Sequence, residues 1–146
     1  MRDGESVFLA LDWAKAFDSI SPEAMARALI RFGRPTKLVV IIMEIYKRRT
    51  FVVHDSGYCS KKRTQHYGIC QGCPLSPFLF TIVMTVLLHD AKEDFENMQG
   101  IVYETFFVQD LVYADDTLLI GVDGDRVQGY MESVVLMGEE YGLQLN

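Results

Sequence analysis

The sequence predicts an α+β domain in which an antiparallel sheet carries its helices on one face. Its 146 residues match the size of one domain, and 49% hydrophobic with 23% charged residues are typical of a chain that buries a packed core. No repeat or Pro/Gly-rich linker divides it, so we predict a single domain over residues 1–146. Apolar patterning and turn residues indicate the order strand, helix, helix, hairpin, helix, strand, strand, helix, strand.

The first strand and the first long helix follow from local signals. Residues 7–11 are an apolar run that ends at Asp12, which is typical of a buried strand whose next residue emerges at a sheet edge. Ser21 suits a helix N-cap, Pro22 suits the first helical position, and Gly33 suits the residue that ends a helix. We therefore predict a strand and then a helix that stops at Gly33.

A second helix and a hairpin are predicted next. The helix runs over residues 35–49, and because residues 38–45 are apolar on nearly every side, we expect it to be deeply buried. Residues 51–53 and 64–67 can pair as a hairpin around the turn-forming residues 55–57.

The second half of the chain continues with a long helix, two strands and a last helix. Ser76 and Pro77 suit the start of the long helix, which runs into the charged stretch 92–96. The later elements follow from apolar periodicity: strands over residues 101–108 and 117–122, a helix over residues 127–141 that ends at Gly142, and the start of a strand over residues 143–146.

The charge balance limits the kind of nucleic-acid contact that is possible. Asp and Glu number 20 and Lys and Arg 14, so the net charge is -6, the wrong sign for a protein whose whole surface grips nucleic acid. Local basic patches remain possible. The two dense basic runs are where we expect phosphate contacts: Lys47, Arg48, Arg49, Lys61, Lys62 and Arg63.

The sequence also predicts where the protein works. Residues 1–6 are polar and no secretory signal follows them. The longest apolar stretch, residues 78–88, is too short to span a bilayer. Three cysteines, an odd number, fit a reducing compartment better than a disulfide framework. We expect no membrane partner and a location inside the cell, in the nucleus or the cytoplasm.

Three carboxylates are the first candidates for chemistry. Asp115 and Asp116 are adjacent between two apolar strands, where a tight turn would hold both. An isolated Asp-Asp pair is usually a solvated turn, but Asp12 ends another strand that could lie beside them. Three converging carboxylates repel one another unless divalent cations neutralise them. Two such ions about 3.5–4 Å apart can clamp the reacting oxygens of a phosphoryl transfer.

A loop and an aromatic residue are further candidates. Residues 71–77 combine Gln71, whose amide can donate and accept, with Gly72, where another molecule could approach closely. Alternatively the segment is only a Pro-rich turn that enters a helix. Phe17 follows Asp12 by five residues and could wall a pocket beside that acid, or be an ordinary core residue.

Four segments together resemble a known family. Residues 9–20, 71–77 and 113–116 look like motifs A, B and C of reverse transcriptases, and residues 142–146 look like the start of motif D. The residues of these motifs are most similar to those of the non-LTR, LINE-type retrotransposon enzymes. The resemblance implies the palm domain of a right-hand polymerase, with a ferredoxin-like core, and an RNA-directed DNA polymerase activity.

The resemblance also implies roles for individual residues. Asp12 and Asp115 would hold two Mg²⁺ ions, or Mn²⁺, with Asp116 as a less direct partner and the Trp13 carbonyl as a further ligand. Phe17 would act as the steric gate against a ribose 2′-hydroxyl. The remaining nucleotide and template contacts would come from Gln71 and Gly72. The implied partners are an RNA template, a DNA primer and dNTPs.

The resemblance covers part of the family's architecture. Only 11 residues precede Asp12, whereas the fingers should lie before motif A, and the thumb should follow motif D. We therefore expect a palm fragment that is inactive alone, with fingers, thumb or flanking domains in a longer polypeptide.

Alternatives with other chemistry stay open at this point. Cys70 and Cys73 form a Cys-x-x-Cys pair before a helix, as in thiol redox proteins. These two cysteines together with Cys59 and His66 could be imagined around zinc. An inactive retroelement remnant that acts as a binding module is the third alternative.

Overall fold

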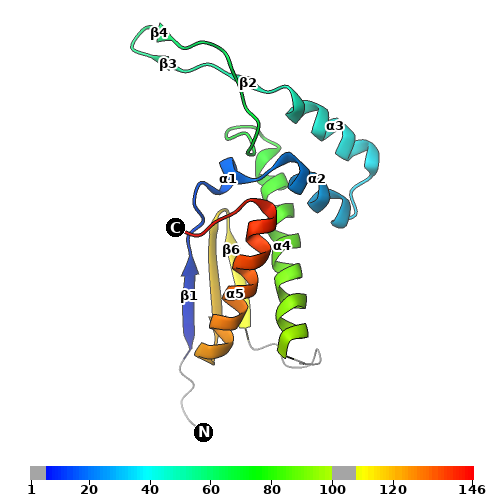
Figure 1. The fold of residues 1–146 in the computed structure, drawn as a ribbon, viewed down its shortest axis with the longest axis vertical. Coiled ribbons are helices and arrows are strands. Elements are labelled where there is room, and N and C mark those ends of the chain that lie inside the picture. Colours follow the sequence, from blue (N-terminus) through cyan, green and yellow to red (C-terminus); the bar gives the residue numbers. More distant parts are fainter. Residues whose placement is uncertain (1–5, 100–107) are drawn as a thin grey trace.

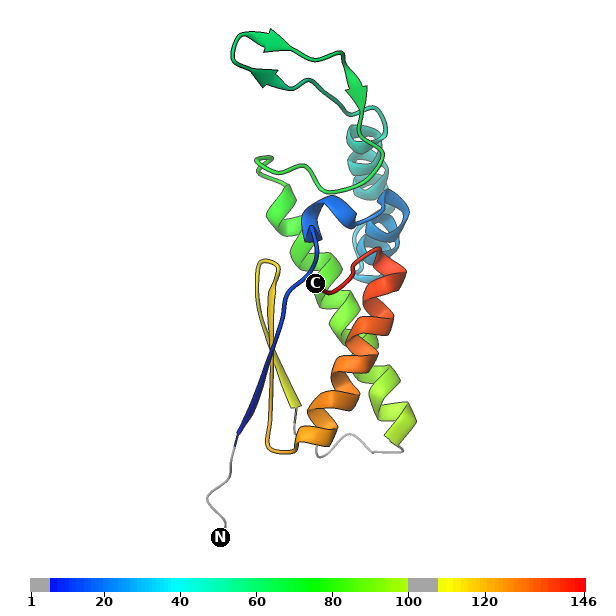
Figure 2. The ribbon, with the colours of Figure 1, turned by 60° about the vertical axis from the view of Figure 1, so that its left-hand side comes forward.

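The protein is built on a three-stranded antiparallel sheet (Figure 1). The computed structural model describes residues 6–99 and 108–146. The strand order is β1 (Val7–Leu11), β7 (Asp116–Gly121), β6 (Val108–Tyr113). Both views show the two longest helices side by side over one face of this sheet: α4 (Ser76–Gln99) and α5 (Gly124–Tyr141) (Figures 1 and 2). The predicted α+β class is confirmed.

The register of the sheet decides which residues share an edge. Leu11 of β1 lies opposite Thr117 of β7, and Tyr113 of β6 lies opposite Asp116. Because both pairings are antiparallel, the end of β1, the start of β7 and the β6–β7 turn meet at one end of the sheet.

The strand β1 is less buried than its sequence suggests. Leu11 is buried, but Phe8 is 64% exposed and the burial alternates along the strand. The expectation of a buried strand is therefore wrong, because among residues 6–99 and 108–146 β1 pairs with β7 alone and the helices cover one face of the sheet (Figures 1 and 2).

The core lies between the sheet and the helices. The largest fully buried side chains come from nearly every part of the described chain: Trp13, Ile20, Met25, Leu29, Ile69, Leu79, Phe80, Met84, Leu87, Leu119, Tyr130 and Leu143. The Tyr130 hydroxyl donates to the Asp110 carboxylate at 3.2 Å, and Asp110 also pairs with Lys92 at 2.6 Å. Burial, and then the charge of Asp110, raises the pKa of Tyr130. This contact ties α4, α5 and β6 together.

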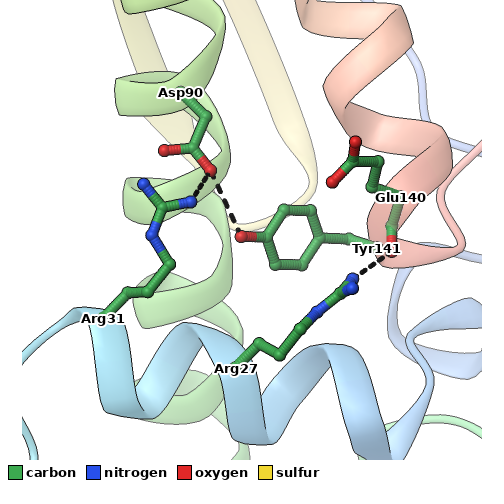
Figure 3. Close-up of polar contacts among 5 residues, drawn as sticks. All are labelled: Arg27, Arg31, Asp90, Glu140 and Tyr141. Atoms are coloured by element: carbon green, nitrogen blue, oxygen red, sulfur yellow. Dashed lines mark hydrogen bonds and ion pairs between the residues drawn. The ribbon is translucent and has the colours of Figure 1, made fainter.

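A polar junction joins three helices, α4, α5 and α2 (Pro22–Arg31) (Figure 3). Asp90 of α4 accepts from the Arg31 guanidinium and from the Tyr141 hydroxyl, the latter at 3.4 Å. Arg27 donates to the Glu140 carbonyl at 2.7 Å. Burial, and then the negative charge of Asp90, raises the pKa of Tyr141. The junction fixes the last turn of α5 against α2 and α4.

The start of α2 agrees with its sequence signals. The Ser21 side chain accepts from the Ala24 amide at 3.0 Å, and Gly33 has a positive φ of 78° just after the helix. One element was not predicted: α1 (Ala16–Ser19), which follows Lys15 at φ 50°. Its four residues are too few to show a helical periodicity in the sequence.

The prediction of deep burial for the second helix is wrong. This helix, α3 (Thr36–Lys47), buries only Val39, Ile42 and Tyr46. Figure 1 shows it beside α2 at one end of the molecule, so only one side of it has a neighbour in the described chain. Met43 is partly buried, and the other four large apolar side chains of α3 are between 43% and 57% exposed: Leu38, Val40, Ile41 and Ile45.

The predicted hairpin is present as an arm, defined here as residues 50–64 (Figure 1). At its base β2 (Thr50–Phe51) pairs with β5 (Arg63–Thr64), and near its tip β3 (His54–Asp55) pairs with β4 (Tyr58–Cys59). Every residue of the arm is exposed. The strands are shorter than predicted because, in the described part of the chain, no layer packs against them to extend the pairing.

The last helix and the residues after it agree in part with expectation. Gly142 ends α5 with φ 87°, as predicted. Residues 143–146 form one antiparallel bridge, between Leu145 and Trp13, and no longer strand. Of the strand predicted over residues 101–108, only Val108 belongs to the described residues. No helix within residues 6–99 and 108–146 has the length and apolar character to cross a membrane.

Replacement of Gly138 by Ala should destabilise the fold. An added Cβ would lie 2.9 Å and 3.0 Å from two atoms of the Trp13 ring, which is only 2% exposed. Overpacking of this kind costs about 1–3 kcal/mol, which exceeds the gain of up to about 1 kcal/mol in helix propensity. We expect a lower free energy of unfolding for Gly138→Ala, measured in urea through the fluorescence of Trp13, the single tryptophan.

A matched substitution in the same helix provides the control. A Cβ added at Gly124 meets nothing within 4 Å, so Gly124→Ala should be neutral or slightly stabilising. Equal unfolding midpoints for the two variants would contradict the close packing of Trp13 on α5.

Candidate functional site

A two-residue turn between β6 and β7 presents two carboxylates. Tyr113 pairs with Asp116, so Ala114 and Asp115 form the turn, and Ala114 takes a positive φ of 54°. The side chains of Asp115 and Asp116 are exposed at this end of the sheet. The turn predicted for this segment is therefore confirmed, and both acids face solvent.

Asp12 reaches the same end of the sheet from the neighbouring strand. The pairing of Leu11 with Thr117 places Asp12 next in register toward Asp116. Its Oδ2 accepts from the Asn146 side-chain amide at 2.8 Å, and its carbonyl accepts from the Asn146 backbone N–H at 3.0 Å. The sequence did not single out Asn146. The signal for it was the short strand expected over residues 143–146, which runs beside the residues that follow Asp12.

Trp13 fixes the backbone directly after Asp12. Its indole Nε1 donates to the Thr117 hydroxyl at 3.1 Å, and its ring packs on Gly138 of α5. The backbone of Trp13 also forms an antiparallel bridge with Leu145. Asp12 therefore extends from a segment that is held by β7, by α5 and by the end of the chain.

A cavity of about 490 Å³ opens beside the acids. It brings together residues from three segments that are far apart in the sequence, and both Gln71 and Gly72 take part. Its lining consists of Phe17, Gln71, Gly72, Cys73, Pro74, Ser76, Pro77 and Asp115. Asp12, Trp13 and Asp116 do not line it.

Phe17 is held in the wall of this cavity by the long helix. Its ring stacks on Phe80 of α4 with centroids 4.3 Å apart and planes 15° apart. The Phe17 carbonyl accepts from the Ile69 amide, just before the loop. Gly68 passes so close to Asp18 that a Cβ there would lie 2.7 Å from the Asp18 Cα. Phe17 is therefore partly a core residue and partly a wall of the cavity.

The loop that carries Gln71 and Gly72 is fixed at its end. Gly72 has a φ of 84°, and an added Cβ would meet nothing within 4 Å. The buried Ser76 hydroxyl donates to the Cys70 carbonyl. Gln71 and Gly72 are exposed, so both remain accessible to a ligand in the cavity.

The carboxylates of Asp12, Asp115 and Asp116 are of the type that binds a hard cation, but they do not form one metal-binding cluster. Carboxylate and carbonyl oxygens are the ligands that Mg²⁺ prefers. Among residues 6–99 and 108–146, however, no three His, Cys, Asp or Glu side chains lie close enough together to hold a metal ion. The structure thus brings the three acids to one edge without assembling a metal cluster.

The positions of the cysteines bear on the two alternatives of a zinc site and a thiol redox protein. Cys59 lies exposed in the arm, whereas Cys70 and Cys73 lie in the loop beside the cavity. All three are free thiols, and in the described part of the chain they form no metal-holding group with His66.

The six basic residues fall into two environments. Lys47 pairs with Glu44 at 3.1 Å on the surface of α3, and Arg48 is exposed. Arg49 turns inward, with its guanidinium 3.9 Å from the Tyr46 ring centroid, and donates to the Gly68 carbonyl. The other three are exposed along the arm: Lys61, Lys62 and Arg63.

Comparison with known proteins shows the family of this chain. Residues 2–146 match the family model described as reverse transcriptase (RNA-dependent DNA polymerase). The Pol polyprotein of the type-1 retrotransposable element R2 of Nasonia vitripennis is 31% identical over 138 residues, which is 92% of this chain and 13% of that protein. The polyprotein of the type-2 element R2DM of Drosophila melanogaster is 30% identical over 136 residues, 93% of this chain and 12% of that protein.

Solved structures show the same fold. Telomerase from Candida tropicalis superposes with a TM-score of 0.70 at 14% identity, over 97% of this chain and 29% of that one. Telomerase from Candida albicans, in complex with a fragment of telomeric RNA, has a TM-score of 0.70 at 15% identity, over 97% and 27%. The predicted polymerase-palm fold and non-LTR type are confirmed. The chain belongs to the reverse transcriptase (RNA-dependent DNA polymerase) family, with similarity to the polyproteins of R2 retrotransposable elements.

Proposed function

We propose that this chain is the palm of an RNA-directed DNA polymerase, which adds deoxynucleotides to the 3′-hydroxyl of a primer. The observation that carries the proposal is the cavity shared by Phe17, the Gln71–Gly72 loop and Asp115, beside an edge that also holds Asp12 and Asp116. An RNA template, a DNA primer and dNTPs are the partners that this activity requires. Such an enzyme works inside the cell, in the nucleus or the cytoplasm.

The acids of the sheet edge are the proposed metal ligands. Asp12, Asp115, Asp116 and the Trp13 carbonyl would hold two Mg²⁺ ions, or Mn²⁺ in their place. When bound, these ions would neutralise the charge on the triphosphate and on the attacking oxygen. The chain itself positions the ligands, because the β1–β7 register and the buried indole of Trp13 fix the place of Asp12.

The walls of the cavity give the proposed contacts with the incoming nucleotide. Phe17, backed by its stack on Phe80, presents a rigid surface against the sugar. Gly72 lets the sugar or a base approach the backbone, and the Gln71 amide can donate or accept beside it. A positioned substrate lowers the barrier because less orientational freedom is lost at the reaction step.

Loss of one edge carboxylate should weaken divalent-cation binding. We expect Asp115→Asn and Asp12→Asn to raise the dissociation constant for Mn²⁺ at least about tenfold, since hard-cation affinity follows the number of charged oxygen ligands. The electron paramagnetic resonance signal of free Mn²⁺ measures this directly. In the expressed polypeptide that contains residues 1–146, the same variants should abolish primer extension on an RNA template.

An acid at the far end of the molecule is the matched control. Asp125, in the first turn of α5, is also exposed, and Asp125→Asn should leave Mn²⁺ affinity unchanged. Similar affinities for all three variants would refute the edge carboxylates as ligands. Normal Mn²⁺ binding with no template-directed extension in the unaltered polypeptide would instead support a binding module.

Shortening Phe17 should relax the choice of sugar. The Phe17→Val variant opens the cavity wall, so incorporation of ribonucleotides relative to deoxynucleotides should rise at least about tenfold in kcat/KM. Phe78→Val is the control, because Phe78 is 69% exposed and does not line the cavity. An unchanged ratio in a Phe17→Val protein with a normal melting transition would rule out the gate.

A further inference from the structure

Residues 70–73 form a β-turn with a cysteine at each end. The Cys73 amide donates to the Cys70 carbonyl at 3.3 Å, and Gly72, the third residue of the turn, has a φ of 84°. A hydrogen bond between the first and fourth residues, with a positive φ at the third, describes a type II turn. The sequence Cys-Gln-Gly-Cys therefore places two thiols at the first and fourth positions of one tight turn.

This turn brings the two cysteines to the separation that a disulfide needs. The Cα atoms of the first and fourth residues of a β-turn lie less than about 7 Å apart. In a disulfide they are usually about 4.4–6.8 Å apart, so the backbone needs little rearrangement to bridge Cys70 and Cys73. Both are free thiols and partly buried, whereas the third cysteine, Cys59, is exposed in the arm.

A single buried residue, Ser76, holds both ends of the turn. Its hydroxyl donates to the Cys70 carbonyl, and its amide donates to the Cys73 carbonyl at 3.0 Å. Ser76 is 2% exposed and is the first residue of α4. The long helix therefore keeps the two cysteines together while both are reduced. Such fixed proximity favours a reaction within the turn over a reaction with a distant thiol.

A disulfide here would change the wall of the cavity that Phe17 and Asp115 line. Cys73 lines this cavity and Cys70 does not. Because bonded sulfurs are about 2.05 Å apart, the bond would either draw the Cys73 sulfur out of the wall or bring the Cys70 sulfur into it. The bond would also enclose Gln71 and Gly72 in a ring, which removes much of the freedom of the turn to adjust to a ligand.

We propose that Cys70 and Cys73 are a modification site, at which a reversible disulfide alters the cavity wall. The oxidant is a small-molecule disulfide, for example glutathione disulfide. One thiolate of the turn attacks it and releases one small thiol, and the second thiolate of the turn then displaces the other. Two S–H bonds of the protein are lost and one S–S bond forms, while the two electrons and two protons leave with the two small thiols.

The consequence for substrate binding rests on the proposed polymerase function. The reduced wall, with the Cys73 sulfur in it and the turn free to adjust, is the one that accepts a nucleotide. The cross-linked protein should therefore bind a deoxynucleotide about tenfold more weakly, a coupling of ordinary size between two sites. Because coupling is reciprocal, saturating deoxynucleotide should favour the dithiol by the same factor, which is about 30 mV for a two-electron couple.

The first experiment maps the disulfide in the protein after equilibration with glutathione buffers of increasing oxidation. Mass spectrometry of unreduced peptides should find a Cys70–Cys73 bond whose fraction rises with oxidation and falls again when reduced glutathione is restored. The control Cys59→Ser removes the thiol of the arm and should leave this titration unchanged. Cys70→Ser should instead retain one glutathione on Cys73, because no second thiol can displace it.

Three results of this experiment would overturn the proposal. The first is the absence of a Cys70–Cys73 bond in fully oxidised buffer. The second is a preferred bond of either residue to Cys59. The third is a bond that forms only above the melting transition, because the folded turn would then not be what joins the two thiols.

The second experiment measures the KM for deoxynucleotide in primer extension, with the expressed polypeptide that contains residues 1–146. Oxidation should raise this KM about tenfold, and reduction should restore it. Cys70→Ser should show the KM of the reduced protein in both buffers, since Cys70 does not line the cavity and its variant cannot form the bond. Cys59→Ser should respond to oxidation as the unaltered protein does. Equal KM values for the oxidised and reduced forms would refute an effect of the disulfide on the cavity.

The two proposals fail separately. No extension by the reduced polypeptide, together with a Cys70–Cys73 bond that titrates as expected, would refute the polymerase function and support the modification site. Extension that depends on Asp115, in a protein that never forms the bond, would do the reverse.

Discussion

Burial of the Trp13 indole is the constraint on which the candidate site depends. The ring packs on Gly138, its N–H bonds to Thr117, and its backbone bridges to Leu145. One side chain therefore ties β1, β7, α5 and the last described residues together at the end of the sheet where Asp12 emerges. Because the indole is buried and its polar atom is satisfied, any rotation of the Asp12 backbone would cost both packing and a hydrogen bond. The position of the acid is thus set by an apolar residue next to it.

Much of this arrangement could be predicted from the sequence because it depends on local chemistry. The cap at Ser21, the end of α5 at Gly142 and the tight turn that presents Asp115 each need only a few neighbouring residues to specify them. Most of the segment 71–77 lies in the cavity wall, which Phe17 and Asp115 also line. Sequence order alone could not show that these segments share one cavity.

The wrong predictions of burial have a common physical origin. Burial depends on which other parts of the chain pack against a helix or strand, and the residues of that element do not show this. The apolar run of α3 implied deep burial, but burial requires a neighbour, and α3 has one only on the side of Val39 and Ile42. Likewise β1 reads as a buried strand although only one face of its sheet is covered. The sequence also could not show that Arg49, within a basic run, stacks its guanidinium on Tyr46 and donates to the Gly68 carbonyl. Periodicity and composition describe a residue's own preferences, whereas these outcomes depend on tertiary contacts.

The net charge of -6 conceals two regions with opposite requirements. At the sheet edge, Asp12, Asp115 and Asp116 form no ion pair with a basic residue of the described chain, so their charge is available to cations. Six of the 14 basic residues lie within residues 47–66, which contain one acidic residue, Asp55. If the two sets lay together, each would neutralise the other, and neither a divalent cation nor a phosphate would gain much by binding. Their separation on a rigid core, joined through Arg49 and Gly68, therefore keeps the acidic edge and the basic region from neutralising each other. The net charge of -6 alone excludes neither cation binding nor polyanion binding.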